Sequence, residues 1–319
     1  IRPVHFRMNE QTAVNNYFQE DLNLKNAEIN KKAQQEFDDF VAILRANGVN
    51  VIVESDDELL DTPDSIFPNN WVSFHENGDV AIYPMFAENR RKERREEVFM
   101  SLEREGFKIE NIIDYTSAED EGLFLEGTGS IVLDRENKIA YCALSPRADE
   151  DLFIEFCEDF DYYPVVFTAY QTANNKRLPI YHTNVMMCIG SVLAIICLEC
   201  IDDKKERKQV LQQLKNTHKT IVTITEIQMN QFAGNMLQLK GSNNQDLLVM
   251  SKSAHDSLTQ NQKMVIEEHC KIVSSSLETI ETCGGGSARC MMAEVFLPHP
   301  RGGQAIQPAL LLLQGLDGR

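Results

Sequence analysis

The stretch Trp71-Val72-Ser73-Phe74-His75-Glu76-Asn77-Gly78-Asp79-Val80-Ala81-Ile82-Tyr83-Pro84 (residues 71–84) decides the fold, because it opens a pattern that the chain repeats. Two short apolar runs flank Asn77-Gly78, the residue pair that tight hairpin turns favour. An amphipathic stretch at Asn89–Glu105 and a further apolar run at Ile109–Ile113 follow. The order predicts a strand, a turn, a strand, a helix and a third strand.

The same ββαβ pattern recurs three times in the middle of the chain. The later copies comprise Ser130–Leu133, Ile139–Leu144, Asp149–Phe160 and Val165–Thr168; Val185–Ile189, Val192–Leu198, Asp203–Lys215 and Thr220–Ile224; and Met236–Leu239, Leu247–Ser251, Gln260–His269 and Ile272–Ser275. Similar segments at a regular period indicate a repeat architecture.

A fifth copy is split between the two ends of the chain. Met291–Leu297 supplies its first strand, and the N-terminus supplies Pro3–Phe6, the helix Asn30–Asn47 and the strand Val51–Val53. The first strands then begin at residues 71, 130, 185, 236 and 291. Joining the two ends in one unit closes a ring, which hides the edges of the sheets.

We therefore predict an α/β fold in which five ββαβ units form a pseudo-symmetric five-bladed propeller. Residues 1–298 are expected to be a single catalytic domain. Residues 299–319 fit no copy of the repeat and are interpreted as a C-terminal tail of the kind that a vector can supply. The alternative is a two-domain α/β protein with chance spacing.

The charge balance limits the partners. The chain carries 31 basic and 49 acidic residues, for a net charge of −18, and would repel nucleic acid and anionic membranes. Val185–Ile201 is too short and too interrupted to span a bilayer. A small-molecule ligand is the expected partner, and a homo-oligomer is compatible with the sequence. Cys188, Cys197 and Cys200 lie in apolar runs typical of reduced, buried thiols, which favours a cytoplasmic location.

The residues just before each first strand should cluster at one end of the ring, because equivalent positions face its axis. They include a thiol, an imidazole, a carboxylate and several carboxamides: Asn69, Asn70, Glu126, His182, Asn184, Asn235 and Cys290. Each residue alone is unremarkable in a strand or turn. Their shared position in the repeat is what favours a functional interpretation.

Cys290, His182 and Glu126 form a candidate catalytic set. An imidazole can activate a thiol, deliver a proton to a leaving amine and activate water, while a carboxylate orients the imidazole. Such a set attacks an electrophilic carbon, expels an amine and hydrolyses the covalent intermediate. No spacing of His, Cys or Asp predicts a metal site, and the glycine runs lack the features of a phosphate loop, so neither metal nor cofactor is expected.

Leu125-Glu126-Gly127, His182-Thr183-Asn184 and the glycine-rich stretch Gly284–Cys290 resemble the guanidino-group-modifying, or pentein, superfamily. That superfamily includes amidinotransferases, arginine deiminases and dimethylarginine dimethylaminohydrolases. Phe67-Pro68-Asn69-Asn70-Trp71 and Gly284–Cys290 look typical of a bacterial branch with a citrulline-utilisation hydrolase. The resemblance implies that Cys290 is the nucleophile, His182 the general acid/base and Glu126 the third member. It also implies that Arg147 binds a substrate α-carboxylate.

Two positions depart from the family pattern. Asn70 and Asn184 stand where enzymes acting on guanidinium usually carry aspartate. Carboxamides suit a neutral ureido group better than a cation, which favours citrulline as the substrate. Asn69 is a further substrate-binding candidate beside Asn70. Asp56–Pro68 is interpreted as a surface loop, although Asp64 would be a substrate-binding candidate if this loop folded over the site.

Other functions remain open from the sequence. The same nucleophile could serve an arginine deiminase or dihydrolase, or an amidinotransferase that passes the group to an amine instead of water. A more distant alternative is a non-catalytic binding protein with the pentein fold. Such a protein would have no need for a thiol, an imidazole and a carboxylate at equivalent positions.

Overall fold

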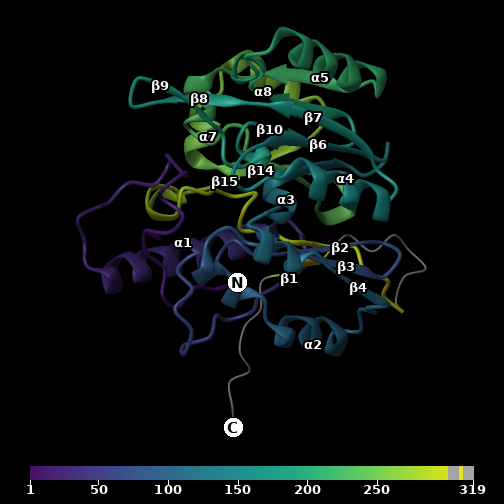
Figure 1. Cartoon of the computed structure of the whole chain (residues 1–319). Helices are drawn as coiled ribbons and strands as arrows, with labels where there is room; N and C mark the ends of the chain where they lie inside the picture. Colours follow the sequence, from purple (N-terminus) through teal and green to yellow (C-terminus); the bar gives the residue numbers. More distant parts are fainter. Residues whose placement is uncertain (301–308, 312–319) are drawn as a thin grey trace.

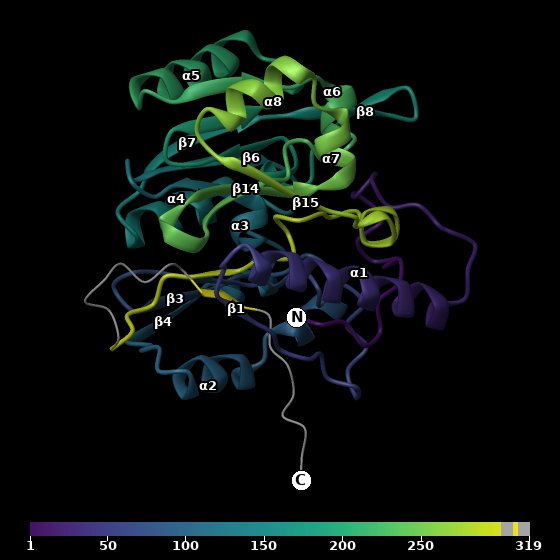
Figure 2. The same ribbon diagram turned by 180° about the vertical axis from the view of Figure 1, so that it is seen from behind.

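The computed structural model of the chain describes residues 1–300 and 309–311. Strands occupy the inside of the molecule, and helices α2, α4, α5 and α8 lie on its outside (Figure 1). Seen from behind, α1 runs across the molecule, and it packs against β15 (Figure 2).

Five three-stranded sheets of the same topology are present in the described residues. In each, the first strand is antiparallel to the middle strand, which is parallel to the third. The strands are β2 (Val72–Phe74), β3 (Asp79–Ile82) and β4 (Asn111–Asp114); β5 (Ile131–Asp134), β6 (Ile139–Leu144) and β7 (Tyr163–Thr168); β10 (Met187–Ile189), β11 (Leu193–Ile196) and β12 (Thr220–Thr223); β13 (Leu237–Lys240), β14 (Asp246–Ser251) and β15 (Lys271–Ser275); and β16 (Glu294–Val295), β17 (Ala309–Leu311) and β1 (Val51–Ile52).

One or two helices connect the middle strand to the third strand in the four internal sheets, and in the fifth sheet a helix precedes the third strand. They are α2 (Glu96–Arg104), α4 (Glu150–Asp159), α5 (Lys204–Asn216), α7 (Lys252–Ser257) with α8 (Gln260–Glu267), and, before β1, α1 (Asn26–Ala46). The side chains of Asp149, Asp203 and Thr259 accept hydrogen bonds from the first-turn backbone N–H groups of α4, α5 and α8, which fixes where these helices begin. The predicted ββαβ order is therefore confirmed in the four internal copies.

The first copy differs from the prediction in its helix. Instead of one helix over Asn89–Glu105, the chain forms the 3₁₀ helix η2 (Glu88–Glu93) and then α2. Arg90 and Glu93 form a buried ion pair of 2.9 Å in η2, so this turn faces the interior. Burying that pair takes precedence over the helical pattern of the sequence.

The middle strand of the fifth sheet comes from the C-terminal region and not from Pro3–Phe6, so this part of the prediction is wrong. β17 pairs with both β16 and β1. Proline has no N–H group, and a central strand must bond on both edges. The N-terminus makes only an isolated bridge between Arg2 and Ser55.

Several short elements lie between the sheets. A two-stranded hairpin, β8 (Tyr170–Ala173) and β9 (Lys176–Pro179), was not predicted; its turn residues Asn174 and Asn175 both have positive φ, which asparagine tolerates. The remaining short helices are η1 (Pro68–Asn70), η3 (Thr116–Glu121), α3 (Gly127–Ser130), η4 (Thr183–Val185), η5 (Leu198–Cys200), α6 (Glu226–Met229), η6 (Ser242–Asn244) and the π-helical turn η7 (Ile280–Gly284).

Asp56–Pro68 is largely buried, so its interpretation as a surface loop is wrong. Asp56 and Asp64 are both nearly inaccessible to solvent. Thr62 and Ser65 donate hydrogen bonds to Asp56, and Asn9 and Thr12 donate to Asp64. These bonds compensate the burial of Asp56 and of Asp64 Oδ2, whereas Asp64 Oδ1 has no hydrogen-bond partner in the described residues.

Two searches of the described residues were negative. None of the helices has the length and apolarity that a bilayer span requires. No group of three or more histidine, cysteine, aspartate or glutamate side chains is arranged to hold a metal ion in this part of the chain.

Truncation after Pro300 should destabilise the protein, because it leaves β1 and β16 without the strand between them. We expect the melting temperature to fall by about 5 °C, as loss of a few net hydrogen bonds implies for a chain of this size. Truncation after Leu311 keeps β17 and is the comparison; that protein should melt at the higher temperature of the two. Equal melting temperatures for the two truncations in differential scanning calorimetry would show that β17 adds nothing.

Candidate active site

A chain of hydrogen bonds joins the residues before all five first strands. Thr128 Oγ1 donates to the Asn69 carbonyl at 3.3 Å, and Asn184 Nδ2 donates to the Thr128 carbonyl at 3.2 Å. Asn235 Nδ2 donates to the Asn184 carbonyl at 3.0 Å, and the Arg289 N–H donates to Asn235 Oδ1 at 3.0 Å. The predicted clustering of these positions is therefore confirmed.

Gly127 allows the second copy of the repeat to approach the backbone of the first copy closely. It has a φ of +46°, and a Cβ built there would lie 2.4 Å from the Asn69 carbonyl oxygen. Only glycine combines a left-handed backbone with room for that contact. The junction between η1 and α3 thus requires the glycine of Leu125-Glu126-Gly127.

Glu126 and His182 form a buried pair. His182 Nε2 lies 2.7 Å from Glu126 Oε2, and both side chains are almost completely inaccessible. Burial lowers the pKa of His182 to about 4, although the hydrogen bond and charge of Glu126 act to raise it. A neutral imidazole that donates Nε2–H to the carboxylate leaves Nδ1 as a proton acceptor.

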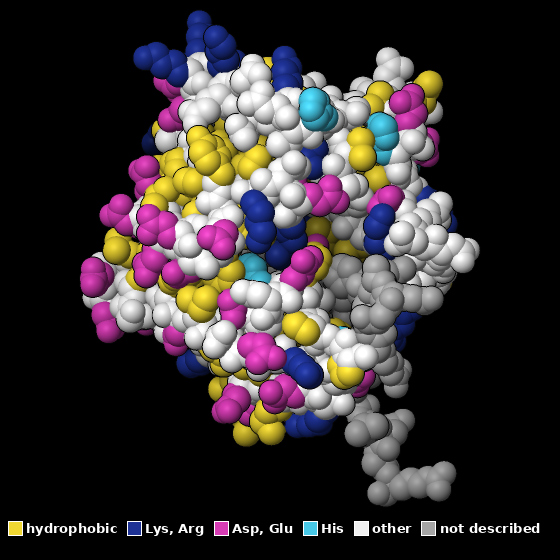
Figure 3. Space-filling view, turned by 90° about the vertical axis from the view of Figure 1, so that its right-hand side faces the viewer, with side chains coloured by type: hydrophobic (Ala, Val, Ile, Leu, Met, Phe, Trp, Pro, Cys, Tyr) yellow, Lys and Arg dark blue, Asp and Glu magenta, His cyan; other side chains and the backbone are white. Residues whose placement is uncertain are grey.

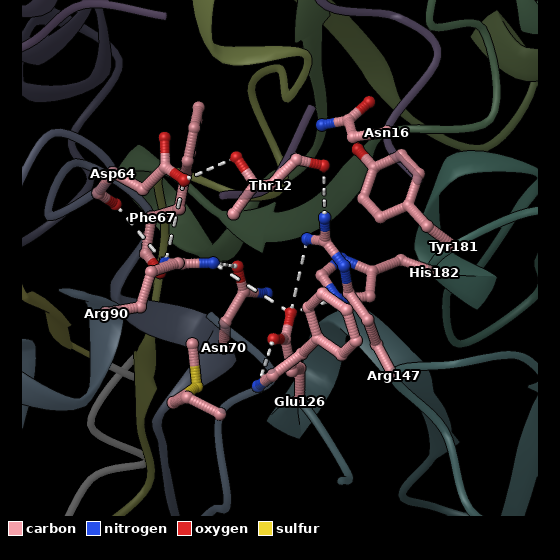
Figure 4. A network of polar contacts seen from close by, with 12 residues as sticks. Thr12, Asn16, Asp64, Phe67, Asn70, Arg90, Glu126, Arg147, Tyr181 and His182 are labelled. Atoms are coloured by element: carbon pink, nitrogen blue, oxygen red, sulfur yellow. Dashed lines mark hydrogen bonds and ion pairs between the residues drawn. The ribbon is translucent and has the colours of Figure 1, made fainter. Parts of the chain in front are cut away.

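Two buried arginines surround the Glu126 carboxylate (Figure 4). Arg147 Nη1 lies 3.5 Å and Arg90 Nη1 3.9 Å from Glu126 Oε2, and the Phe86 N–H donates to Oε1 at 3.0 Å. Burial alone would raise the pKa of Glu126, but Arg147, His182 and Arg90 outweigh it and lower the pKa to about 2. Glu126 is therefore ionised at neutral pH.

Arg147 is held by the N-terminal segment. Its Nε donates to Asn15 Oδ1 and its Nη2 to the Thr12 carbonyl, each at 2.8 Å. The guanidinium lies between the rings of Phe86 and Tyr181, 5.8 Å and 5.0 Å from their centroids. A substrate carboxylate would have to displace Thr12 and Asn15 to bind this arginine.

Asn70 and His182 point toward the same spot above Gly129. Asn70 Oδ1 accepts a 2.8 Å hydrogen bond from Arg90, whereas its buried Nδ2 has no partner in the described residues. A Cβ on Gly129 would lie 2.4 Å from Asn70 Nδ2 and 2.8 Å from His182 Nδ1. An unpaired donor and a proton acceptor therefore converge where glycine leaves space. Neither polar atom of the buried Asn69 side chain has a partner in this part of the chain.

Cys290 lies at the other end of the hydrogen-bond chain. Its sulfur receives hydrogen bonds from Asn235 Nδ2 at 3.2 Å and from Asn184 Nδ2 at 3.6 Å. Among the hydrogen bonds of the described residues, none joins Cys290 to His182. The structure thus places the thiol with Asn184 and Asn235, and places Asn70 and Arg147 around Glu126 and His182.

The N-terminal segment covers these groups. Asn16 Nδ2 donates to the carbonyls of Gly284 and Gly285 at 3.3 Å and 3.2 Å, and Thr12 Oγ1 donates to Asp64 at 3.0 Å. Arg90, Tyr181 and these N-terminal residues were missed by the sequence analysis. Arg90 sits in a basic run that resembles a solvated helix face, and nothing local marks Thr12 or Asn15.

A cavity of about 560 Å³ opens away from the N-terminal cover. Arg135, Lys240, Arg289 and Glu294 line it, and Thr128 and Asn184 reach it from the hydrogen-bond chain. Figure 3 shows the right-hand face of the molecule, where basic and acidic side chains gather around a hollow. Cys290, His182 and Glu126 do not line this cavity.

Acid should destabilise the protein through His182. As the pH is lowered from 6.5 to the folded pKa of about 4, the imidazole takes up a proton only in the unfolded chain. The free energy of unfolding therefore decreases as the pH decreases. The pKa difference corresponds to about 3 kcal/mol. In urea titrations, the free energy of unfolding of His182→Gln should therefore decrease between pH 6.5 and 4 by about 3 kcal/mol less than that of the wild type.

His218→Asn is the matched control, because His218 is exposed and has a left-handed backbone that asparagine accepts. It should keep the wild-type pH dependence. Burial also lowers the pKa of His75 to about 2. His75 therefore decreases the free energy of unfolding over the same pH interval, equally in the wild type and in both variants. Identical pH profiles for wild type and His182→Gln would contradict a buried neutral imidazole.

Comparison with known proteins extends these observations. The family model of the eukaryotic N,N dimethylarginine dimethylhydrolases matches residues 2–297. A search of curated protein sequences found no match.

Several solved structures share the fold. Apo ArgZ, an arginine dihydrolase from the ornithine-ammonia cycle in cyanobacteria, has a TM-score of 0.69 at 17% identity over 94% of this chain and 40% of that chain. AgrE with ornithine and NAD⁺ gives 0.70 at 16% identity, over 96% and 39%. A dimethylarginine dimethylaminohydrolase adduct with S-methyl-L-thiocitrulline gives 0.58 at 14%, over 82% and 88%. This protein thus spans about 40% of the length of the ArgZ and AgrE chains that it matches.

The resemblance to guanidino-group-modifying enzymes is confirmed by these matches. The five sheets have the topology that the repeat predicts, and the matched proteins act on arginine or its derivatives. Because the family model extends over nearly all of the described residues, this chain belongs to the N,N dimethylarginine dimethylhydrolase family of C–N bond hydrolases.

Proposed function

We propose that the protein hydrolyses the guanidino group of a small arginine-like amino acid and continues the reaction at the ureido stage. The observation that carries this proposal is the convergence of Asn70 Nδ2 and His182 Nδ1 above Gly129. A guanidinium offers only hydrogen-bond donors, whereas a ureido oxygen or a water molecule can accept from Asn70. The site therefore suits an arginine dihydrolase better than an enzyme that stops after one hydrolysis.

In the proposed reaction Cys290 is the nucleophile. Its proton passes to His182 Nδ1, and the sulfur bonds to the guanidino carbon. A C–N bond then breaks, and His182 returns the proton to the nitrogen that leaves as ammonia. Water attacks the resulting thiouronium, the C–S bond breaks, and a ureido group and the free thiol remain. Glu126 holds the imidazole and stabilises its protonated form.

The ureido group is the substrate of a second round. Attack by Cys290 expels a second ammonia and leaves a thiocarbamate. Hydrolysis of that thioester gives a carbamate, which loses carbon dioxide to leave the amine. Citrulline is then an intermediate that the enzyme also accepts from solution. This retains the role of the carboxamides inferred from the sequence, without requiring citrulline to be the only substrate.

The amino-acid end of the substrate is proposed to bind beneath the N-terminal segment. Arg147 is the candidate for the α-carboxylate, with the bidentate fork that such groups favour. Thr12 and Asn15 occupy that fork, so binding would begin with their displacement. Asp64, Asn69 and Asn184 are proposed to shape the remaining walls. Asn184 does so while it donates to Thr128 and Cys290.

The five sheets are proposed to form one five-bladed pseudo-symmetric ring within a single catalytic domain. Contacts between first strands support this arrangement: β16 packs on β2, β5 on β10, and β10 on β13. The hydrogen-bond chain from Asn69 to Arg289 follows the same order of copies.

Product stoichiometry tests the reaction. Arginine should yield two ammonia for each ornithine, and citrulline should yield one. Cys290→Ala should lower kcat at least about 10⁴-fold with arginine and with citrulline, because alanine cannot form the covalent intermediate. Ammonia assays with amino-acid analysis measure all three products. A citrulline end product that is not consumed, or a new guanidino product when glycine is added, would favour a deiminase or an amidinotransferase.

Asn70→Asp should separate the two stages. The aspartate keeps an acceptor for Arg90 but removes the donor that we assign to the ureido oxygen. We expect arginine consumption within about tenfold of wild type and at least a hundredfold slower citrulline hydrolysis, the size of effect that losing one such donor has. Asn216→Asp, at the exposed end of α5, is the control and should change neither rate. Equal losses for both substrates would remove the assignment of Asn70 to the second stage.

A further inference from the structure

Asn235 is a fully buried asparagine just before β13, and every polar atom of its side chain is engaged. Its Nδ2 donates to the Asn184 carbonyl at 3.0 Å and to the Cys290 sulfur at 3.2 Å. Its Oδ1 accepts from the Arg289 N–H at 3.0 Å. One amide therefore joins three copies of the repeat and contacts the thiol.

We propose that Asn235 is a further catalytic residue, which fixes the Cys290 sulfur in position and stabilises its thiolate through the Nδ2–H donor. The proposal rests on the assignment of Cys290 as nucleophile. Asn235 shares its position in the repeat with the candidate catalytic residues, and the contact with the thiol gives that position a role.

The geometry leaves the amide little freedom. Rotation about its last side-chain bond would break the hydrogen bonds to the Asn184 carbonyl and the Arg289 N–H together. The second Nδ2–H is thereby directed at the sulfur. A neutral thiol is a weak acceptor, whereas a thiolate accepts a charge-assisted bond about twice as strong as a neutral one. The donor therefore favours the ionised, reactive form.

Asn184 cannot replace this contact. Its Nδ2 lies farther from the sulfur, at 3.6 Å, and also serves the Thr128 carbonyl. The titratable groups that interact electrostatically with Cys290 include Arg289 in its own turn and Tyr181 before η4. Tyr181 is neutral because burial raises its pKa. Arg289 supports the thiolate by charge, and Asn235 supports it by a directed hydrogen bond.

Two variants separate these functions of the amide. Asn235→Asp has nearly the same shape and keeps an acceptor for the Arg289 N–H, but it loses the donor to sulfur. Asn235→Ala loses donor and acceptor without adding charge. Gln238→Ala is the control, because Gln238 is a carboxamide on β13 that bonds Ser191 and Asp246 instead of the thiol.

The measurement is the rate at which iodoacetamide alkylates Cys290 at each pH, followed by mass spectrometry of the peptide that contains it. We expect the inflection to move upward by about one pH unit in Asn235→Ala, as loss of a hydrogen bond to a charged group implies. It should move further in Asn235→Asp, because the new carboxylate also repels the thiolate. On arginine, kcat should fall by about tenfold or more, with KM within about threefold of wild type. Gln238→Ala should keep the wild-type inflection and kcat.

An unchanged alkylation profile in the Asn235 variants would overturn the proposal and leave Asn235 a structural residue of the turn. If Asn235→Ala does not fold, Asn235→Leu, which also removes the donor without adding charge, decides the question by the same measurement. Alkylation needs no substrate, so it tests Asn235 independently of the reaction. Turnover that survives Cys290→Ala would instead refute the proposed function, whatever the alkylation profiles show.

Discussion

The ionised carboxylate of Glu126 is the group around which the interior of this protein is organised. A buried charge is costly unless hydrogen bonds and opposite charges compensate it. Here His182, the Phe86 N–H, Arg147 and Arg90 supply that compensation. Each of them in turn needs partners, which come from the N-terminal segment and from η2. These groups outweigh the cost of burial and lower the pKa of Glu126 to about 2, so its carboxylate is charged at neutral pH.

This constraint explains why segments without regular structure are so deeply buried. Thr12 is buried and Asn15 half-buried where they supply the acceptors that Arg147 requires, and Asp64 lies beside Arg90 for the same reason. The thiol of Cys290 and the imidazole of His182 are likewise almost inaccessible to water. Exclusion of water strengthens every electrostatic interaction in the site. The N-terminal segment thus both supports the burial of Glu126, through Arg147, and lies where the proposed substrate would enter.

The repeat places chemically different residues at equivalent positions, and hydrogen bonds between the turns then couple them. Asn184 and Asn235 act at both levels, because the Nδ2 group of each donates both to a carbonyl of a neighbouring copy and to the Cys290 sulfur. A substitution at such a position alters the junction between copies and the reactivity of the thiol together. The fold and the chemistry share the same few carboxamides.

The sequence by itself determined the ββαβ order, the hairpin turns and the alignment of Glu126, His182 and Cys290, because hydrophobic period and turn chemistry are local properties. It could not place β17, since a strand that joins the two ends of the chain is selected by its partners and not by its own composition. It could not identify Arg90 or the contacts of Arg147 either. Buried ion pairs and hydrogen bonds between distant segments are decided by tertiary structure, where the cost of an unpaired charge selects the partner.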